Sequence, residues 1–75
     1  MKIKFSRHAK RRGKLYKIPE TTVSNILKNM KLTQGKHEIL KKINELKYPL
    51  RIVIDVKDDI ITVITNYPLK KGRKK

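Results

Sequence analysis

The distribution of apolar residues predicts a short strand at the start of the chain and a clear amphipathic helix after it. Residues 2–5 alternate polar and apolar, with Ile3 and Phe5 on the inward side, as in a half-buried strand. Residues 19–30 begin with Pro19 and Glu20, which suit the first turn of a helix. The apolar residues that follow form one helical stripe: Val23, Ile26, Leu27 and Met30.

A shorter, basic helix is predicted between these two elements. The hydroxyl of Ser6 can accept a hydrogen bond from a free backbone N–H of the next turn, as an N-cap residue does. The helix then runs from Arg7 to about Tyr16. Gly13 costs about 1 kcal/mol in a helix interior, so an end at Gly13 is the alternative.

The second half of the chain predicts a β-hairpin preceded by an ambiguous segment. Residues 36–47 have apolar residues at helical spacing, yet a strand at 36–43 would fit an antiparallel sheet. Residues 50–57 alternate apolar and polar, Asp58-Asp59 indicates a tight turn, and the β-branched residues 60–67 indicate a central strand that Pro68 ends.

Two registers of this hairpin are possible. If the turn has two residues, the apolar side chains of both strands share a face that packs on the helix: Ile52, Ile54, Val56, Ile61 and Val63. A shift of one residue would instead bring Arg51 beside Thr65 and Tyr67.

The predicted fold class is therefore α+β. A short N-terminal strand and two helices precede an antiparallel sheet of about three strands. We expect one domain over residues 1–68, because 75 residues leave room for only one, and a disordered basic tail over residues 69–75.

The charge of the chain indicates a polyanionic partner. Lys and Arg number 21 against 6 acidic residues, which gives a net charge of +15. Self-repulsion on this scale opposes a compact state, and a bound nucleic acid would offset it. A lysine-rich surface of the kind common in thermophiles would carry matching glutamate, but only Glu20, Glu38 and Glu45 are present. Residues 1–17 contain no acid, and the tail is basic throughout, so both chain ends are expected to form a phosphate-binding face.

Several classes of protein are disfavoured by the sequence. There are no cysteines, and His8 and His37 are too far apart to suggest a metal site, so neither a metal nor a cofactor is expected. No apolar run approaches the roughly 20 residues that cross a bilayer, and the first residues lack the apolar stretch of a signal peptide. An intracellular, cytoplasmic protein without a membrane partner is the expectation.

The segment around His8 has the residue types that RNA cleavage needs. On a helix, His8 shares one face with Arg11 and Arg12. Cleavage requires a base for the 2′-hydroxyl, an acid for the leaving 5′-oxygen and cations for the charge that develops on phosphorus. The alternative is that the arginines bind phosphate without chemistry. Tyr67 could stack on a base, supply a hydroxyl or cap the core.

The motif Ser6-x-His8-Ala9-x-x-Arg12, with Arg51-x-Val53 and Thr65-x-Tyr67-Pro68 later in the chain, resembles a family of small prokaryotic domains of unknown function with an HAxxR signature. That family is similar to the ribonuclease toxins that include RelE-type toxins and the barnase and colicin nucleases. The resemblance implies helices followed by an antiparallel sheet and a metal-independent ribonuclease site. His8 and Arg12 would match the signature pair, and Thr65 and Tyr67 the pair of the final strand.

The sequence departs from the family pattern at two places. Tyr16-Lys17 stands where an arginine–glycine pair is frequent, and Gly13 stands where a larger apolar residue is usual. Either departure could reflect a shifted helix, which leaves the role of Arg12 open.

The leading hypothesis is a toxin-like, metal-independent endoribonuclease that acts on RNA. His8 is the candidate general acid or base, Arg12 and Arg51 would stabilise phosphate charge, and Thr65 and Tyr67 would position the substrate. The candidate nucleic-acid contacts are Arg7, Lys10, Arg11, Lys14, Lys70, Lys71 and Arg73. The alternatives are a non-catalytic nucleic-acid-binding module and an interaction domain for an acidic protein partner such as an antitoxin.

Overall fold

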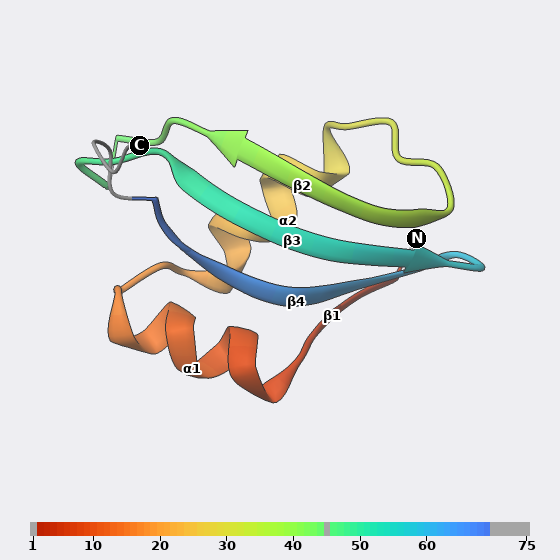
Figure 1. The fold of residues 1–75 in the computed structure, drawn as a ribbon, viewed down its shortest axis with the longest axis horizontal. Coiled ribbons are helices and arrows are strands. Elements are labelled where there is room, and N and C mark those ends of the chain that lie inside the picture. Colours follow the sequence, from red (N-terminus) through yellow and green to blue (C-terminus); the bar gives the residue numbers. More distant parts are fainter. Residues whose placement is uncertain (1, 45, 70–75) are drawn as a thin grey trace, which may run out of the picture.

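The computed structural model describes residues 2–44 and 46–69, which form an α+β fold. The elements in chain order are β1 (Lys2–Phe5), α1 (Arg7–Leu15), α2 (Glu20–Lys28), β2 (Gly35–Lys41), β3 (Leu50–Lys57) and β4 (Ile60–Pro68). The strands form one sheet in the order β1-β4-β3-β2 (Figure 1). The fold class predicted from the sequence is confirmed, while residues 70–75 of the expected tail lie outside the described residues.

The sheet has four strands rather than about three, because β1 pairs with the free edge of β4. The expected antiparallel strands β2, β3 and β4 are present, and β1 joins them in parallel, which makes the sheet mixed. The backbone N–H of Lys2 donates to the carbonyl of Asp59 at 2.8 Å, and that of Ser6 to the carbonyl of Val63 at 3.0 Å. The alternation of residues 2–5 predicts a strand but contains no information on which strand it pairs with.

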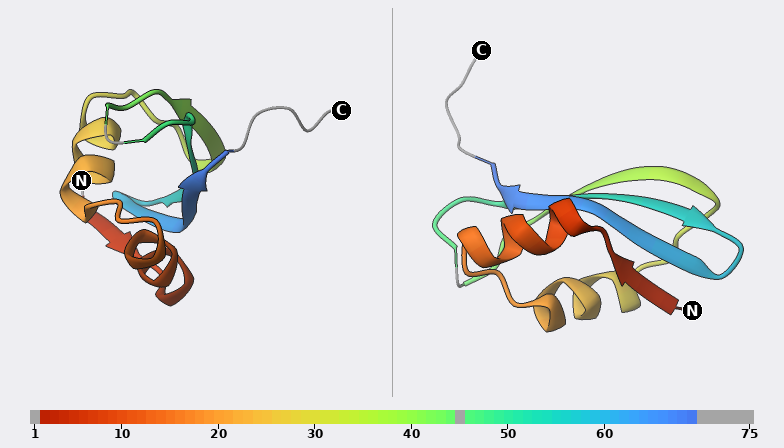
Figure 2. Two further views of the ribbon diagram at one scale, coloured as in Figure 1. Left: turned by 90° about the vertical axis from the view of Figure 1, so that its left-hand side faces the viewer. Right: turned by 90° about the horizontal axis from the view of Figure 1, so that it is seen from below.

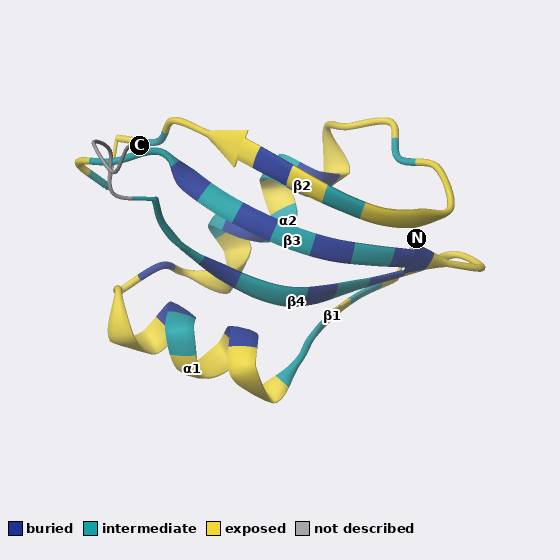
Figure 3. Cartoon of the chain, viewed as in Figure 1, coloured by how far each residue is buried: buried dark blue, intermediate teal, exposed yellow. Residues whose placement is uncertain are grey.

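The core lies between the sheet and α2. Val23 and Leu27 of α2 are each 1% exposed, and α2 lies behind the sheet in Figure 1. Along β3, buried and half-buried residues alternate, as Figure 3 shows. The buried sheet residues are Ile39, Leu50, Ile52, Ile54, Val56, Ile61 and Val63.

Helix α2 is shorter than the apolar stripe suggests. The N–H groups of Asn29 and Met30 bond to carbonyls three residues back, at 3.3 and 3.2 Å, which tightens and closes the last turn. Met30 therefore lies beyond the helix and is 41% exposed, so its inclusion in the buried stripe was wrong.

The first part of the ambiguous segment 36–47 is a strand, β2 (Gly35–Lys41), while residues 42–44 and 46–47 form neither helix nor strand. Ile39 is buried whereas the neighbouring Leu40 is 56% exposed, as expected for alternating faces of a strand and not for a helical stripe.

Helix α1 continues past Gly13 and ends in a Schellman motif. The N–H of Ile18 donates to the carbonyl of Gly13 at 2.8 Å, and that of Lys17 to the carbonyl of Lys14 at 3.3 Å. Lys17 has φ of 57°, the left-handed conformation in which glycine is preferred. Gly13 is buried, and a Cβ there would lie 3.2 Å from the carbonyl oxygen of Ile18. The alternative end at Gly13 was wrong, and a larger residue there would have to displace the carbonyl of Ile18 by a few tenths of an ångström.

A β-bulge in β4 changes the register within the hairpin, so each of the two predicted registers occurs on one side of the bulge. Ile54 pairs with Val63 whereas Val53 pairs with Thr65, so Ile64 has no partner on β3. Before the bulge, Ile61 and Val63 face the core; after it, Asn66 is buried and Thr65 and Tyr67 turn to the other face. The two-residue turn and the pairing of Arg51 with Tyr67 therefore occur in the same hairpin.

Ser6 links this bulge to the start of α1. Its hydroxyl donates to the carbonyl of Ile64 at 2.8 Å and accepts from the N–H of Ala9 at 3.0 Å, which confirms Ser6 as the N-cap residue. One hydroxyl thus satisfies the carbonyl that the bulge leaves without a strand partner and one of the free N–H groups of the helix.

We expect Ser6→Ala to lower the free energy of unfolding by about 1–3 kcal/mol, since it removes a cap and leaves a partly buried carbonyl without its partner. Urea denaturation measures this loss. Thr21→Ala, at an exposed position of α2, is the control, and an equal loss in both variants would contradict the role of Ser6.

Lys17→Gly should instead stabilise the protein, by about 1 kcal/mol, because glycine adopts the left-handed conformation without the steric penalty of a Cβ atom. Lys14→Gly, inside α1, should destabilise it by a similar amount. Thermal unfolding of both variants checks the opposite signs.

Candidate nucleic-acid interface

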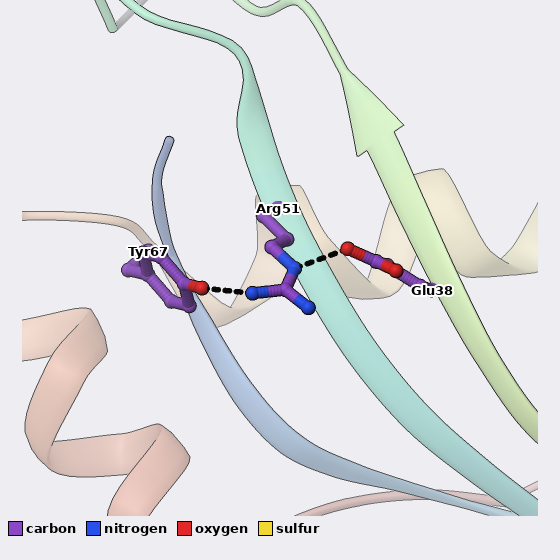
Figure 4. A network of polar contacts seen from close by, with 3 residues as sticks. All are labelled: Glu38, Arg51 and Tyr67. Atoms are coloured by element: carbon purple, nitrogen blue, oxygen red, sulfur yellow. Dashed lines mark hydrogen bonds and ion pairs between the residues drawn. The ribbon is translucent and has the colours of Figure 1, made fainter. Parts of the chain in front are cut away.

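The outer face of the sheet, which carries Glu38, Arg51, Val53, Thr65 and Tyr67, contains a network of polar side chains. Arg51 on β3 donates through Nη1 to the hydroxyl of Tyr67 on β4. Its Nε forms an ion pair with the carboxylate of Glu38 on β2. Figure 4 shows Arg51 between these two partners, so one guanidinium joins three neighbouring strands.

A second arginine reaches the same tyrosine from α1. The Cζ atom of Arg12 lies 5.6 Å from the ring centroid of Tyr67, as does that of Arg51. These distances are within the range of cation–π attraction. We name Arg12, Glu38, Arg51 and Tyr67 the arginine–tyrosine cluster.

The packing of α1 explains why Arg12 lies beside the Tyr67 ring. Asn66, which the bulge turns inward, donates through Nδ2 to the carbonyl of Ala9 at 3.2 Å. Helix α1 lies beside β4 (Figure 2), and its buried residues are the small Ala9 and Gly13, which allow a close approach. Arg12, beside this buried face, is half-buried and points to the outer face of the sheet, where Tyr67 lies.

The charge of Arg51 is stabilised by its partners. Its hydrogen bond with Tyr67 and then that with Glu38 raise the pKa of Arg51 above its usual value, against a smaller opposing effect of burial. A raised pKa favours the protonated form of an already strong base, so Arg51 remains a cation at every pH at which carboxylates and histidines titrate.

The other two predicted catalytic residues lie near the cluster without joining it. Thr65 is on the same strand face as Tyr67 and pairs with Val53, but its hydroxyl is buried and has no hydrogen-bond partner among the described residues. His8 is exposed on α1, one helical turn before Arg12, and forms no hydrogen bond to a described residue. His37 lies elsewhere, with Nε2 donating to the carbonyl of Thr33 at 2.7 Å.

The predicted phosphate contacts of the first helix line a separate groove. Arg7, Lys10, Arg11 and Lys14 are exposed and line an open groove of about 710 Å³ together with Lys17. Gly13, Ile18, Pro19 and Glu20 complete the lining. We name this the basic groove. Lys70, Lys71 and Arg73 lie outside the described residues.

Sequence reasoning missed Glu38 and the groove. Glu38 lies within the segment that could be a helix or a strand, and only the strand puts it opposite Val53 and near Arg51. Recognising the alternation of β2 could have found it. The groove forms because the chain turns between α1 and α2. The spacing of residues along one helix does not predict that turn.

Within residues 2–44 and 46–69, no cluster of His, Asp or Glu side chains could hold a metal ion. In the same residues, neither helix has the length and apolar character needed to span a membrane.

No family model matches the chain, and neither curated proteins nor solved structures give a significant match.

Because the ion pair between Arg51 and Glu38 is partly exposed, Glu38→Gln should change the free energy of unfolding by less than about 1 kcal/mol. Asp59→Asn, at an exposed turn position, removes the same charge as a control. A loss well above that of the control in urea denaturation would mean that Glu38 stabilises the fold as well as the cluster.

Proposed function

We propose that the protein binds single-stranded RNA across the outer face of the sheet and cleaves it without a metal ion. The observation that carries this proposal is the approach of two guanidinium groups, from α1 and β3, to the ring of Tyr67. Two cations beside an aromatic ring suit a nucleotide, whose phosphate binds arginine and whose base stacks on the ring.

The cleavage step would be attack of the 2′-oxygen on the adjacent phosphorus. The new bond joins this oxygen to phosphorus, the bond from phosphorus to the 5′-oxygen breaks, and the products are a 2′,3′-cyclic phosphate and a 5′-hydroxyl. Arg12 and Arg51 would stabilise the charge that develops on the phosphoryl oxygens. Two proton transfers complete the reaction, one from the 2′-hydroxyl and one to the 5′-oxygen.

The side chains available for these transfers differ in position. His8 is exposed on the same side of α1 as Arg12, where its ring is free to meet a bound strand, and we assign it one of the two transfers. Glu38, beside Arg51, is the carboxylate in reach of the other. Tyr67 would position the substrate, and Thr65, whose hydroxyl is buried, would support Tyr67 from the same strand face.

A non-catalytic RNA-binding module is the second candidate. The observation in its favour is that His8 forms no hydrogen bond with the cluster or any other described residue, so no partner fixes its ring for proton transfer. RNA binding would then depend on the arginines, the tyrosine ring and the net charge alone. The resemblance of the motif around His8 and Arg12 to the HAxxR family supports the first candidate only.

We expect the purified protein to cleave labelled single-stranded RNA at low salt in the presence of EDTA. His8→Ala, Arg12→Ala and Arg51→Ala should each lower the cleavage rate by about 100-fold or more. Lys28→Ala, an exposed cation at the end of α2, is the control and should cleave at nearly the wild-type rate. Circular dichroism verifies that each variant folds.

Three results separate the candidates. Cleavage that stops when the RNA carries 2′-deoxyribose at the cut site supports attack by the 2′-oxygen. RNA that the wild type retards but leaves intact identifies a binding module. RNA that is neither bound nor cleaved would falsify both candidates.

A further inference from the structure

The basic groove is formed by the side of α1 that faces away from the arginine–tyrosine cluster. An α-helix turns about 100° per residue, so Lys10 and Lys14, two residues on either side of Arg12, lie roughly opposite it around the helix axis. The groove is closed on its other side by the turn at Lys17, by Pro19 and by Glu20, the first residue of α2. The groove and the cluster therefore lie on opposite sides of one short helix.

The cations of the groove have no anionic partner in the part of the chain that is described. The ion pair between Arg51 and Glu38 is the only one found among those residues. Glu20, the single carboxylate of the groove lining, forms no ion pair with any of the five cations. With five cations and one carboxylate, the lining carries a net charge of +4, and the low-dielectric wall focuses this field so that the groove concentrates anions.

The dimensions of the groove fit a nucleic-acid backbone. Arg7, Lys10, Arg11 and Lys14 follow the spacing i, i+3, i+4 and i+7, which aligns them along one side of α1. From Arg7 to Lys14 the helix rises by about 10 Å. A stacked strand advances about 3.4 Å per nucleotide, so this row matches roughly three successive phosphates.

An acidic peptide fits the same groove less well. A peptide that docks on a basic surface also needs apolar pockets for its anchoring side chains. The uncharged lining residues provide little of this: Gly13 has no side chain and Ile18 is 5% exposed. Of the uncharged residues, Pro19 alone is exposed.

We propose that the basic groove is a second binding site for the RNA backbone, which holds about three phosphates of the strand outside the arginine–tyrosine cluster. This inference rests on the RNA-binding part of the proposed function and is independent of cleavage. The bound RNA strand crosses α1 between the basic groove and the arginine–tyrosine cluster, past the exposed His8 and Arg11. The groove contributes affinity without sequence preference, whereas Tyr67 contacts a base.

The test uses a 12-nucleotide RNA with 2′-O-methyl groups, which the proposed reaction cannot cleave. Binding is measured by fluorescence anisotropy over a range of salt concentrations for the wild type and for Lys10→Gln/Lys14→Gln. The control is Lys28→Gln/Lys31→Gln, which removes the same charge at exposed positions at and beyond the end of α2. Glutamine has a helix propensity close to that of lysine, so α1 is retained, as circular dichroism will verify.

Loss of two phosphate contacts should reduce the slope of log K against log salt by about 1.4, at roughly 0.7 per contact with a single strand, and should weaken binding about 25-fold near 0.1 M salt, counted from equal binding at 1 M. The control should keep the wild-type slope. Equal slopes for the two double variants would overturn the groove as a site and would leave binding at the cluster untouched.

The same measurements separate this inference from the proposed cleavage. Loss of affinity of the groove variant for the 2′-O-methyl RNA supports the groove, and the ribonuclease is refuted separately if the wild type leaves an unmodified RNA of the same sequence uncut. A glutamate-rich peptide that binds the wild type but not the groove variant, with RNA affinity equal in both, would overturn the inference in favour of an acidic protein partner.

Discussion

The single-residue bulge at Ile64 is the feature on which the rest of the structure depends. An unbroken β4 would direct Ile61, Val63, Thr65 and Tyr67 to one face, and the last two would then displace core residues. The bulge keeps the first pair inward, buries Asn66 and turns Tyr67 outward beside Arg51. Its unpaired carbonyl is satisfied by Ser6, which also caps α1. The hydroxyl of Ser6 therefore holds the start of α1 against the strand that carries Tyr67. Because α1 is held in this position, its residue Arg12 lies beside the Tyr67 ring.

Patterns with a strong period could be read from the sequence, whereas features set by tertiary contact could not. The alternation of residues 50–57 and the turn at Asp58-Asp59 predicted the hairpin correctly. Ser6 as the N-cap residue predicted the start of α1 correctly. Residues 36–47 could not be assigned, since Ile39 and its apolar neighbours satisfy a helical period until pairing with β3 selects the strand. The pairing of β1 with β4 is a long-range contact that a four-residue pattern does not encode.

The candidate site shows the same division. In the sequence analysis, Arg51 lies beside Tyr67 only if the hairpin register shifts by one residue. That register was an alternative to the one in which the apolar side chains of both strands share a buried face. A bulge reconciles the two, but no glycine or other signal marks it, because the extra residue is the β-branched Ile64. Two local features of α1 were also not predicted: Gly13 leaves room for the carbonyl of Ile18, and Lys17 takes the left-handed conformation that glycine would prefer.

The two sides of α1 differ in what they can do with a bound anion. At the arginine–tyrosine cluster each cation has a neighbour: Glu38 and the Tyr67 hydroxyl hold Arg51 in one orientation, and the ring attracts Arg12. Such fixed donors suit the recognition of one phosphate, because little reorganisation is needed when it binds. In the basic groove the cations are long, exposed and without ion-pair partners among the described residues, so the proposed RNA strand would be attracted at many positions along its length. Since α1 is only about 10 Å wide, one RNA strand could contact both sides of the helix. The basic groove would hold the RNA loosely, and the arginine–tyrosine cluster would position it.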